Sequence, residues 1–105
     1  MAILKNITNT PSESGDLLID PDNYSSSISN INISSIMISN NHAIDEVAID
    51  IYIESGTNTH YYLCKGLAIP VGVSLVLDEE FSFNIGSSTL RIETSVDPNL
   101  TIIIN

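Results

Sequence analysis

The strongest constraint on the fold is a regular alternation of apolar and polar side chains in several short segments. The clearest segment spans residues 47–54, where Val or Ile occupies every odd position and Ala, Asp, Tyr and Glu occupy the even ones. A period of two residues is that of a β-strand with one face in a core. A one-residue shift in pairing would bury Asp50 and Glu54, so the facing of this strand is well determined.

The composition supports a sheet protein. The chain of 105 residues has 18 Ile, 5 Val and 7 Thr, so that 30 residues are β-branched, and its 15 Ser and 11 Asn suit polar turns. A single domain of this length buries roughly 60–65% of its unfolded surface. With only one cysteine, no internal disulfide can form.

Seven or eight short segments of this kind follow one another between residues 28 and 105. They are residues 31–33, 36–38, 47–54, 59–65, 74–77, 81–85, 90–94 and 100–104. A phase change at Ser34–Ser35 predicts a β-bulge, and residues 54–58 predict a hairpin loop. Pro70 and Gly72 predict a bend between sheets or a turn. The spacing indicates an all-β, antiparallel β-sandwich of jelly-roll or immunoglobulin-like type.

The first 27 residues differ from the rest. Ala2–Thr8 predicts a short strand, residues 9–15 form a loop rich in turn-forming residues, and the apolar residues 17–19 precede another turn. We interpret residues 1–27 as an N-terminal arm with one or two short strands. Such an arm lies along a sheet edge or reaches a neighbouring subunit, while residues 28–105 form the sandwich of a single domain.

The charge balance excludes several kinds of partner. Against 13 acidic residues the chain has 3 basic ones, which gives a formal net charge of -10. This excess repels nucleic-acid phosphates and anionic lipid headgroups, so neither nucleic acid nor a membrane is an expected partner. No segment approaches the roughly 18 consecutive apolar residues of a membrane span. The N-terminus does not read as a signal peptide, which predicts a soluble protein made in a cytosol.

No pattern predicts catalysis, and we expect no enzyme and no catalytic, cofactor-binding or metal-binding residues. His42 lies in a predicted turn, His60 lies on a hairpin strand, and no serine has the motif of a nucleophile elbow. Cys64 alternates onto one strand face with His60 and Tyr62, but two ligands are too few for a closed zinc site. We therefore expect Cys64 to act as a small, partly buried hydrophobe.

Two acidic segments are weak candidates for cation binding. Asp20, Asp22 and Asn23 are similar to the start of a calcium loop, but Tyr24 occupies the next ligand position and the closing glutamate is absent. The segment 78–80 is an exposed, unspecific acidic corner. Four Asn-x-Ser/Thr triplets are expected by chance in such a composition; they begin at Asn6, Asn23, Asn32 and Asn99.

Three tyrosines lie on the predicted hairpin. Tyr52, Tyr61 and Tyr62 are placed on adjacent strands, where aromatic contacts stabilise the pairing, and outward tyrosines can also recognise protein or sugar. Because Tyr52 shares its face with Asp50 and Glu54, a solvated sheet surface with cross-strand contacts is the favoured interpretation.

The ordered series of segments between Ile31 and Ile104 resembles small β-sandwich virion proteins of tailed bacteriophages, particularly those of marine cyanobacterial phages. The segments are IMISNN at 36–41, VAIDIYI at 47–53, YYLCKG at 61–66 and IPVGVSL at 69–75. The family carries no catalytic residues. The resemblance implies a structural protein of the virion, made in the host bacterial cytoplasm.

Within the virion, the resemblance implies a capsid decoration or cement protein first, and a neck, tail or fibre component as the alternative. A receptor- or carbohydrate-binding module is a further alternative. The expected partners are other virion proteins, the major capsid protein foremost. Symmetric virion sites also favour a homo-oligomer, with a trimer preferred.

Overall fold

The computed structural model describes residues 3–8, 15–20, 30–56, 59–95 and 98–105, and these contain strands and no helix. The ten strands are β1 (Ile3–Ile7), β2 (Asp16–Leu17), β3 (Asn30–Ile33), β4 (Ile36–Asn40), β5 (Val47–Ser55), β6 (Thr59–Ile69), β7 (Ser74–Leu77), β8 (Phe81–Asn84), β9 (Ser88–Thr94) and β10 (Leu100–Ile104). All pairings between them are antiparallel, which confirms the prediction of an all-β, antiparallel fold. In this part of the chain, nothing has the helical length and apolarity needed to cross a bilayer.

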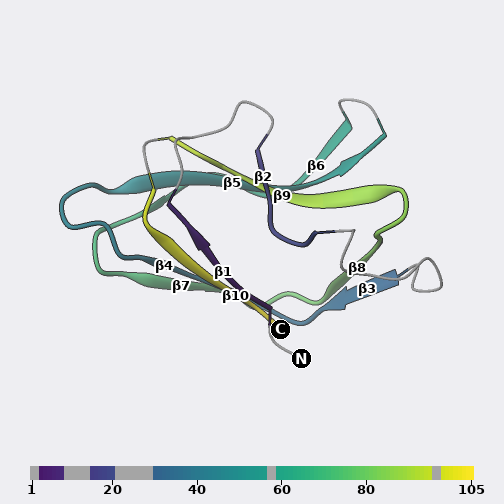
Figure 1. Ribbon diagram of the computed structural model, residues 1–105, viewed down its shortest axis with the longest axis horizontal. Coiled ribbons are helices and arrows are strands. Elements are labelled where there is room, and N and C mark those ends of the chain that lie inside the picture. The colour runs from purple at the N-terminus through teal and green to yellow at the C-terminus, as the bar shows by residue number, and fades with distance from the viewer. Residues whose placement is uncertain (1–2, 9–14, 21–29, 57–58, 96–97) are drawn as a thin grey trace.

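The strands form three sheets, with the orders β1-β10-β4-β7, β2-β9-β5-β6 and β3-β8. The two four-stranded sheets lie on opposite sides of the molecule, and β3 and β8 extend from one end (Figure 1). A single core receives side chains from both of the larger sheets. Ile38 and Ile102 enter it from one sheet and Ile49, Ile51 and Ile92 from the other, each at most 1% exposed.

Of the ten strands, β1 and β2 belong to the predicted N-terminal arm, and both pair within the two larger sheets. β1 pairs with β10 and β2 pairs with β9, each at the edge of its sheet. Ile7, Leu18 and Ile19 are at most 2% exposed and belong to the core. The Lys5 ammonium donates a hydrogen bond to the Leu17 carbonyl and so joins the two strands.

The predicted irregularity at Ser34–Ser35 separates two pairings. β3 pairs with β8 and β4 pairs with β7, so that residues 34–35 lie opposite the three residues 78–80. The extra residue therefore lies in the connection between β7 and β8, and not in the segment 34–35 where the bulge was predicted. Ser35 instead exchanges two backbone hydrogen bonds with Asn105, of 3.2 Å and 3.0 Å.

The predicted hairpin is formed by β5 and β6, with Glu54 opposite His60. The register shifts twice along β6, because Gly66 and Leu63 each fall in an irregularity of the ladder. Gly66 has a φ of 65°, and its N–H donates to the Asp50 carboxylate over 2.6 Å. A glycine tolerates this left-handed conformation, so the strand continues through it.

The bend predicted at Pro70 and Gly72 is a four-residue turn that carries the chain from one large sheet to the other. The Val73 N–H donates to the Pro70 carbonyl over 3.2 Å, and Gly72 has a φ of 75°. A type II turn requires a positive φ at its third residue, which is Gly72 here. The turn therefore connects the terminal strand of one large sheet, β6, to the terminal strand of the other, β7.

Candidate functional site

Tyr52 lies on the outward face of β5, yet its side chain is 0% exposed. The His60 ring stacks on it with centroids 4.3 Å apart, and the Tyr62 ring tilts against it at 5.5 Å. Gly15 packs so close that a Cβ there would lie 2.6 Å from the Tyr52 hydroxyl. The predicted solvated surface is therefore wrong at this position, and Tyr52 is not available to an external ligand.

Polar contacts complete this aromatic cluster. The Tyr52 hydroxyl donates to Glu93 Oε1 over 3.1 Å, and His60 Nε2 lies 3.0 Å from Glu54 Oε2. Burial, together with the hydrogen bond and charge of Glu93, raises the pKa of Tyr52 well above its ordinary value. A hydroxyl that stays protonated is a poor nucleophile, so these contacts serve to hold β5, β6 and β9 together.

The buried Tyr52 hydroxyl predicts a steep loss of stability in alkali. Above pH of about 10 the unfolded chain releases this proton while the folded protein retains it, so the stabilisation is complete below that pH and is lost as pH rises. Each further pH unit should lower the free energy of unfolding by about 1.4 kcal/mol for this one group. Urea unfolding measured at a series of alkaline pH values gives the slope.

Two variants isolate the contribution of Tyr52. Tyr52→Phe should remove this part of the alkaline slope while costing about 1 kcal/mol at neutral pH for the hydrogen bond to Glu93. Tyr61→Phe changes a side chain that is 61% exposed and should keep the slope of the parent protein. An identical slope in Tyr52→Phe and in the parent would contradict the prediction.

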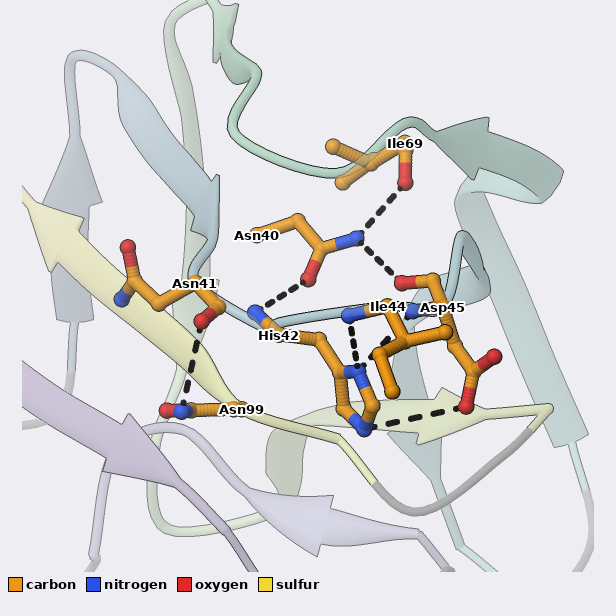
Figure 2. Close-up of polar contacts among 7 residues, drawn as sticks. All are labelled: Asn40, Asn41, His42, Ile44, Asp45, Ile69 and Asn99. Carbon is orange, nitrogen blue, oxygen red and sulfur yellow. Dashed lines mark hydrogen bonds and ion pairs between the residues drawn. The ribbon is translucent and has the colours of Figure 1, made fainter.

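Asn40, at the end of β4, is a buried polar residue only 1% exposed. Its Nδ2 donates to the carbonyls of Asp45 and Ile69 over 3.0 Å and 2.9 Å, and its Oδ1 accepts the His42 N–H over 3.0 Å. Figure 2 shows these bonds converging on the Asn40 amide. The amide therefore ties the β4–β5 connection to the end of β6.

The His42 side chain also stabilises the β4–β5 connection, through hydrogen bonds to backbone groups of that connection. Its Nδ1 accepts the backbone N–H groups of Ile44 and Asp45 over 3.1 Å and 2.9 Å (Figure 2). Because Nδ1 accepts, the ring proton resides on Nε2, which lies 3.7 Å from the Asp45 carboxylate. Both ring nitrogens of His42 are therefore engaged by the β4–β5 connection itself.

The predicted common face of Cys64 and His60 is wrong. Leu63 falls in a register shift, so that Cys64 lies opposite Ile51 whereas Tyr62 lies opposite Tyr52. One extra residue reverses the alternation, and Cys64 packs half-buried against the core on the other face of the sheet. Burial raises the pKa of the Cys64 thiol, which keeps it in the weakly nucleophilic protonated form.

The two acidic segments that are weak candidates for cation binding are only partly described by the structure. In the described ranges, no three or more His, Cys, Asp or Glu side chains form a group that could hold a metal ion. Asp20 is exposed at the end of a described segment, and Asp22 and Asn23 lie outside the described residues. Residues 78–80 are exposed in the connection from β7 to β8.

The open edge formed by β6 and β7 is the remaining candidate. Each is a terminal strand of its sheet, so that one side of each has no ladder partner among the described strands. Leu63 of β6 and Val76 of β7 line one groove of about 410 Å³. The large apolar side chains exposed on these strands are Tyr61 (61%), Tyr62 (42%), Leu63 (37%) and Val76 (55%).

No protein family model, curated protein or solved structure matches this chain. Function must therefore be inferred from the described side chains themselves. The groove has no counterpart among the sites predicted from sequence, because its two walls come from different sheets. The available signal was the uninterrupted apolar run Tyr61–Leu63, which breaks the alternation of its strand.

Proposed function

We propose that the chain is a non-enzymatic structural protein of a tailed-phage virion, and most specifically a decoration or cement protein of the capsid. In this proposal, the two four-stranded sheets form a β-sandwich of jelly-roll or immunoglobulin-like type. Its working surface is the open edge of β6 and β7. A neck, tail or fibre position is the alternative within the virion.

The observation that supports the proposal is that β6 and β7 carry exposed apolar side chains and that each has no ladder partner on one side among the described strands. A free edge presents backbone donors and acceptors to any other strand, and an isolated protein gains nothing from that exposure. Tyr61 and Val76, both more than half exposed, add apolar area to this edge. In an assembled particle, contact with neighbouring subunits would bury both features.

The polar side chains support a structural role. Tyr52, His42 and His60 are occupied by contacts within the subunit, and the outer surface is strongly acidic, with a net charge of -10. We propose the major capsid protein as the first partner and a homo-oligomer, with a trimer favoured, as the assembled state. Nucleic acid and membrane are not among the proposed partners.

The receptor- or carbohydrate-binding alternative retains one favourable observation. Tyr61 and Tyr62 are both exposed, on opposite faces of β6, and the Lys65 ammonium lies 4.7 Å from the centre of the Tyr62 ring. Tyr52, which this alternative would also use, is buried. The exposed edge therefore favours assembly over sugar recognition.

Quantitative mass spectrometry of purified virions tests the proposal. In particles of the phage that encodes the chain, we expect a copy number comparable to that of the capsid lattice sites. A few copies per particle would favour the neck, tail or fibre position instead. Absence from the virion would contradict the structural role altogether.

A further inference from the structure

The groove between β6 and β7 has an apolar interior and an acidic rim. Its lining residues are Ile36, Leu63, Val76, Leu77, Phe81, Asp78 and Glu79. Ile36 is fully buried beneath it, Leu77 and Phe81 are half-buried, and Asp78 and Glu79 are exposed. A ligand that lies in the groove would therefore meet apolar side chains below and carboxylates at its border.

The backbone of β7 is arranged to accept another strand beside this groove. The Asn40 N–H donates to the Val73 carbonyl over 3.0 Å, which marks a hydrogen-bonded pair in the register of β4 and β7. Bonded and non-bonded pairs alternate along an antiparallel ladder. The N–H and C=O groups of Ser74 and Val76 therefore point away from β4, toward the open edge.

The carboxylates at the rim favour a ligand that carries positive charge. Asp78 and Glu79 border the groove itself, and Glu80 follows them in the same exposed connection. An acidic or neutral segment would gain no attraction there, whereas Lys or Arg would form ion pairs with the rim and associate faster.

A second copy of this chain does not have that chemistry. Its only three basic residues each have a contact within their own subunit. Lys5 donates to the Leu17 carbonyl, Lys65 lies over the Tyr62 ring, and Arg91 donates to the Gly15 carbonyl over 3.2 Å. A second copy would also bring a net charge of -10 to an acidic rim.

We infer that the groove binds an extended segment of another protein in which apolar side chains alternate with Lys or Arg. The segment pairs with the outward backbone groups of Ser74 and Val76, its apolar side chains enter the groove, and its basic side chains reach Asp78 and Glu79. This inference rests on the proposed function, because it names the kind of partner that the free edge takes.

Synthetic peptides test the inference without a virus particle. The probe is a peptide of about ten residues with alternating Val and Lys, and the controls replace Val by Ser or Lys by Glu. We expect the Val–Lys peptide to bind at least about tenfold more tightly than either control. Amide NMR spectra of the protein should then show the largest shifts at residues 74–77 and at Leu63.

Matched charge reversals separate the rim from the overall charge of the protein. Glu79→Lys and Glu46→Lys change the net charge equally, but Glu46 lies at the other end of β4, in the exposed connection to β5. We expect Glu79→Lys to weaken binding about tenfold and Glu46→Lys to leave it nearly unchanged. If the two variants weakened binding equally, or if the control peptide with Ser in place of Val bound as tightly as the Val–Lys peptide, the interaction would be unspecific charge attraction. Either result would overturn the inference.

The remaining outcomes distinguish this inference from the proposed function. Self-association abolished by Glu79→Lys would assign the groove to a second copy and would also overturn the inference. Peptide binding by a protein that is absent from virions would uphold the groove and reject the virion role. A virion protein that binds none of the peptides would uphold the role and reject the groove.

Discussion

Replacing Asn40 with alanine should lower the free energy of unfolding by about 3–4 kcal/mol. The substitution leaves the carbonyls of Asp45 and Ile69 and the His42 N–H without their partner, in a place where the side chain is 1% exposed. Each buried group left unpaired costs about 1–3 kcal/mol. Urea unfolding followed by circular dichroism measures the loss.

Two further variants test the geometry of the Asn40 amide. Asn40→Asp keeps the size and the acceptor but sets a carboxylate oxygen against two carbonyl oxygens, so it should destabilise at least as much as alanine at neutral pH. Asn41→Ala removes a bond of 2.7 Å to the Thr101 hydroxyl at an exposed site and should cost at most about 1 kcal/mol. Similar small losses for Asn40→Ala and Asn41→Ala would contradict the role of Asn40.

Deleting residues 1–20 should abolish folding. The deletion removes Ile7, Leu18 and Ile19 from the core, and burial of such side chains contributes about 1.5–3 kcal/mol each. It also leaves β9 and β10 without their outer partners and uncovers Tyr52 where Gly15 packs. These losses are comparable to the total stability of a small domain, about 5–15 kcal/mol. Circular dichroism and amide NMR dispersion report whether the shortened chain folds.

A matched pair of point variants on β1 gives the same test in milder form. Ile7→Ala should cost about 2–4 kcal/mol because Ile7 is 2% exposed, whereas Leu4→Ala changes a side chain that is 72% exposed and should stay within about 0.5 kcal/mol. If the deletion left a folded protein that no longer attached to particles, residues 1–20 would instead be a detachable arm.

Features that depend on local alternation could be predicted from the sequence. The inward facing of Val47, Ile49 and Ile51 follows from a period of two within one strand, and the β5–β6 hairpin follows from the loop between its strands. The crossing at Pro70 and Gly72 likewise follows from residues that break a ladder. Such signals lie within a few neighbouring positions, so no knowledge of the remaining fold is needed.

Features that depend on strand register and on packing between distant segments could not be predicted from the sequence. The irregularity at Leu63 reverses the face on which Cys64 lies. The sequence does not indicate this irregularity, because the run Tyr61–Leu63 is apolar throughout and has no alternation that could be interrupted. Tyr52 is buried because Gly15, from a remote segment, approaches its hydroxyl. Asn40 has the sequence signature of a turn, and the carbonyl of Ile69 that satisfies its buried amide is distant in the chain.

The candidate site was the least predictable part for the same reason. The groove exists because Leu63 of one sheet and Val76 of the other meet across the turn between β6 and β7. The acidic corner at residues 78–80 was visible in the sequence, but its position beside exposed apolar side chains was not. Edge strands can be identified only once all the pairings are known.

Cryo-electron microscopy of the virion tests the central claim most directly. We predict repeated all-β density on the outer surface of the capsid at lattice positions, with the β6–β7 edge turned toward the neighbouring protein. Density for this chain that is absent from the capsid, or a capsid-bound subunit whose β6–β7 edge faces solvent, would contradict it.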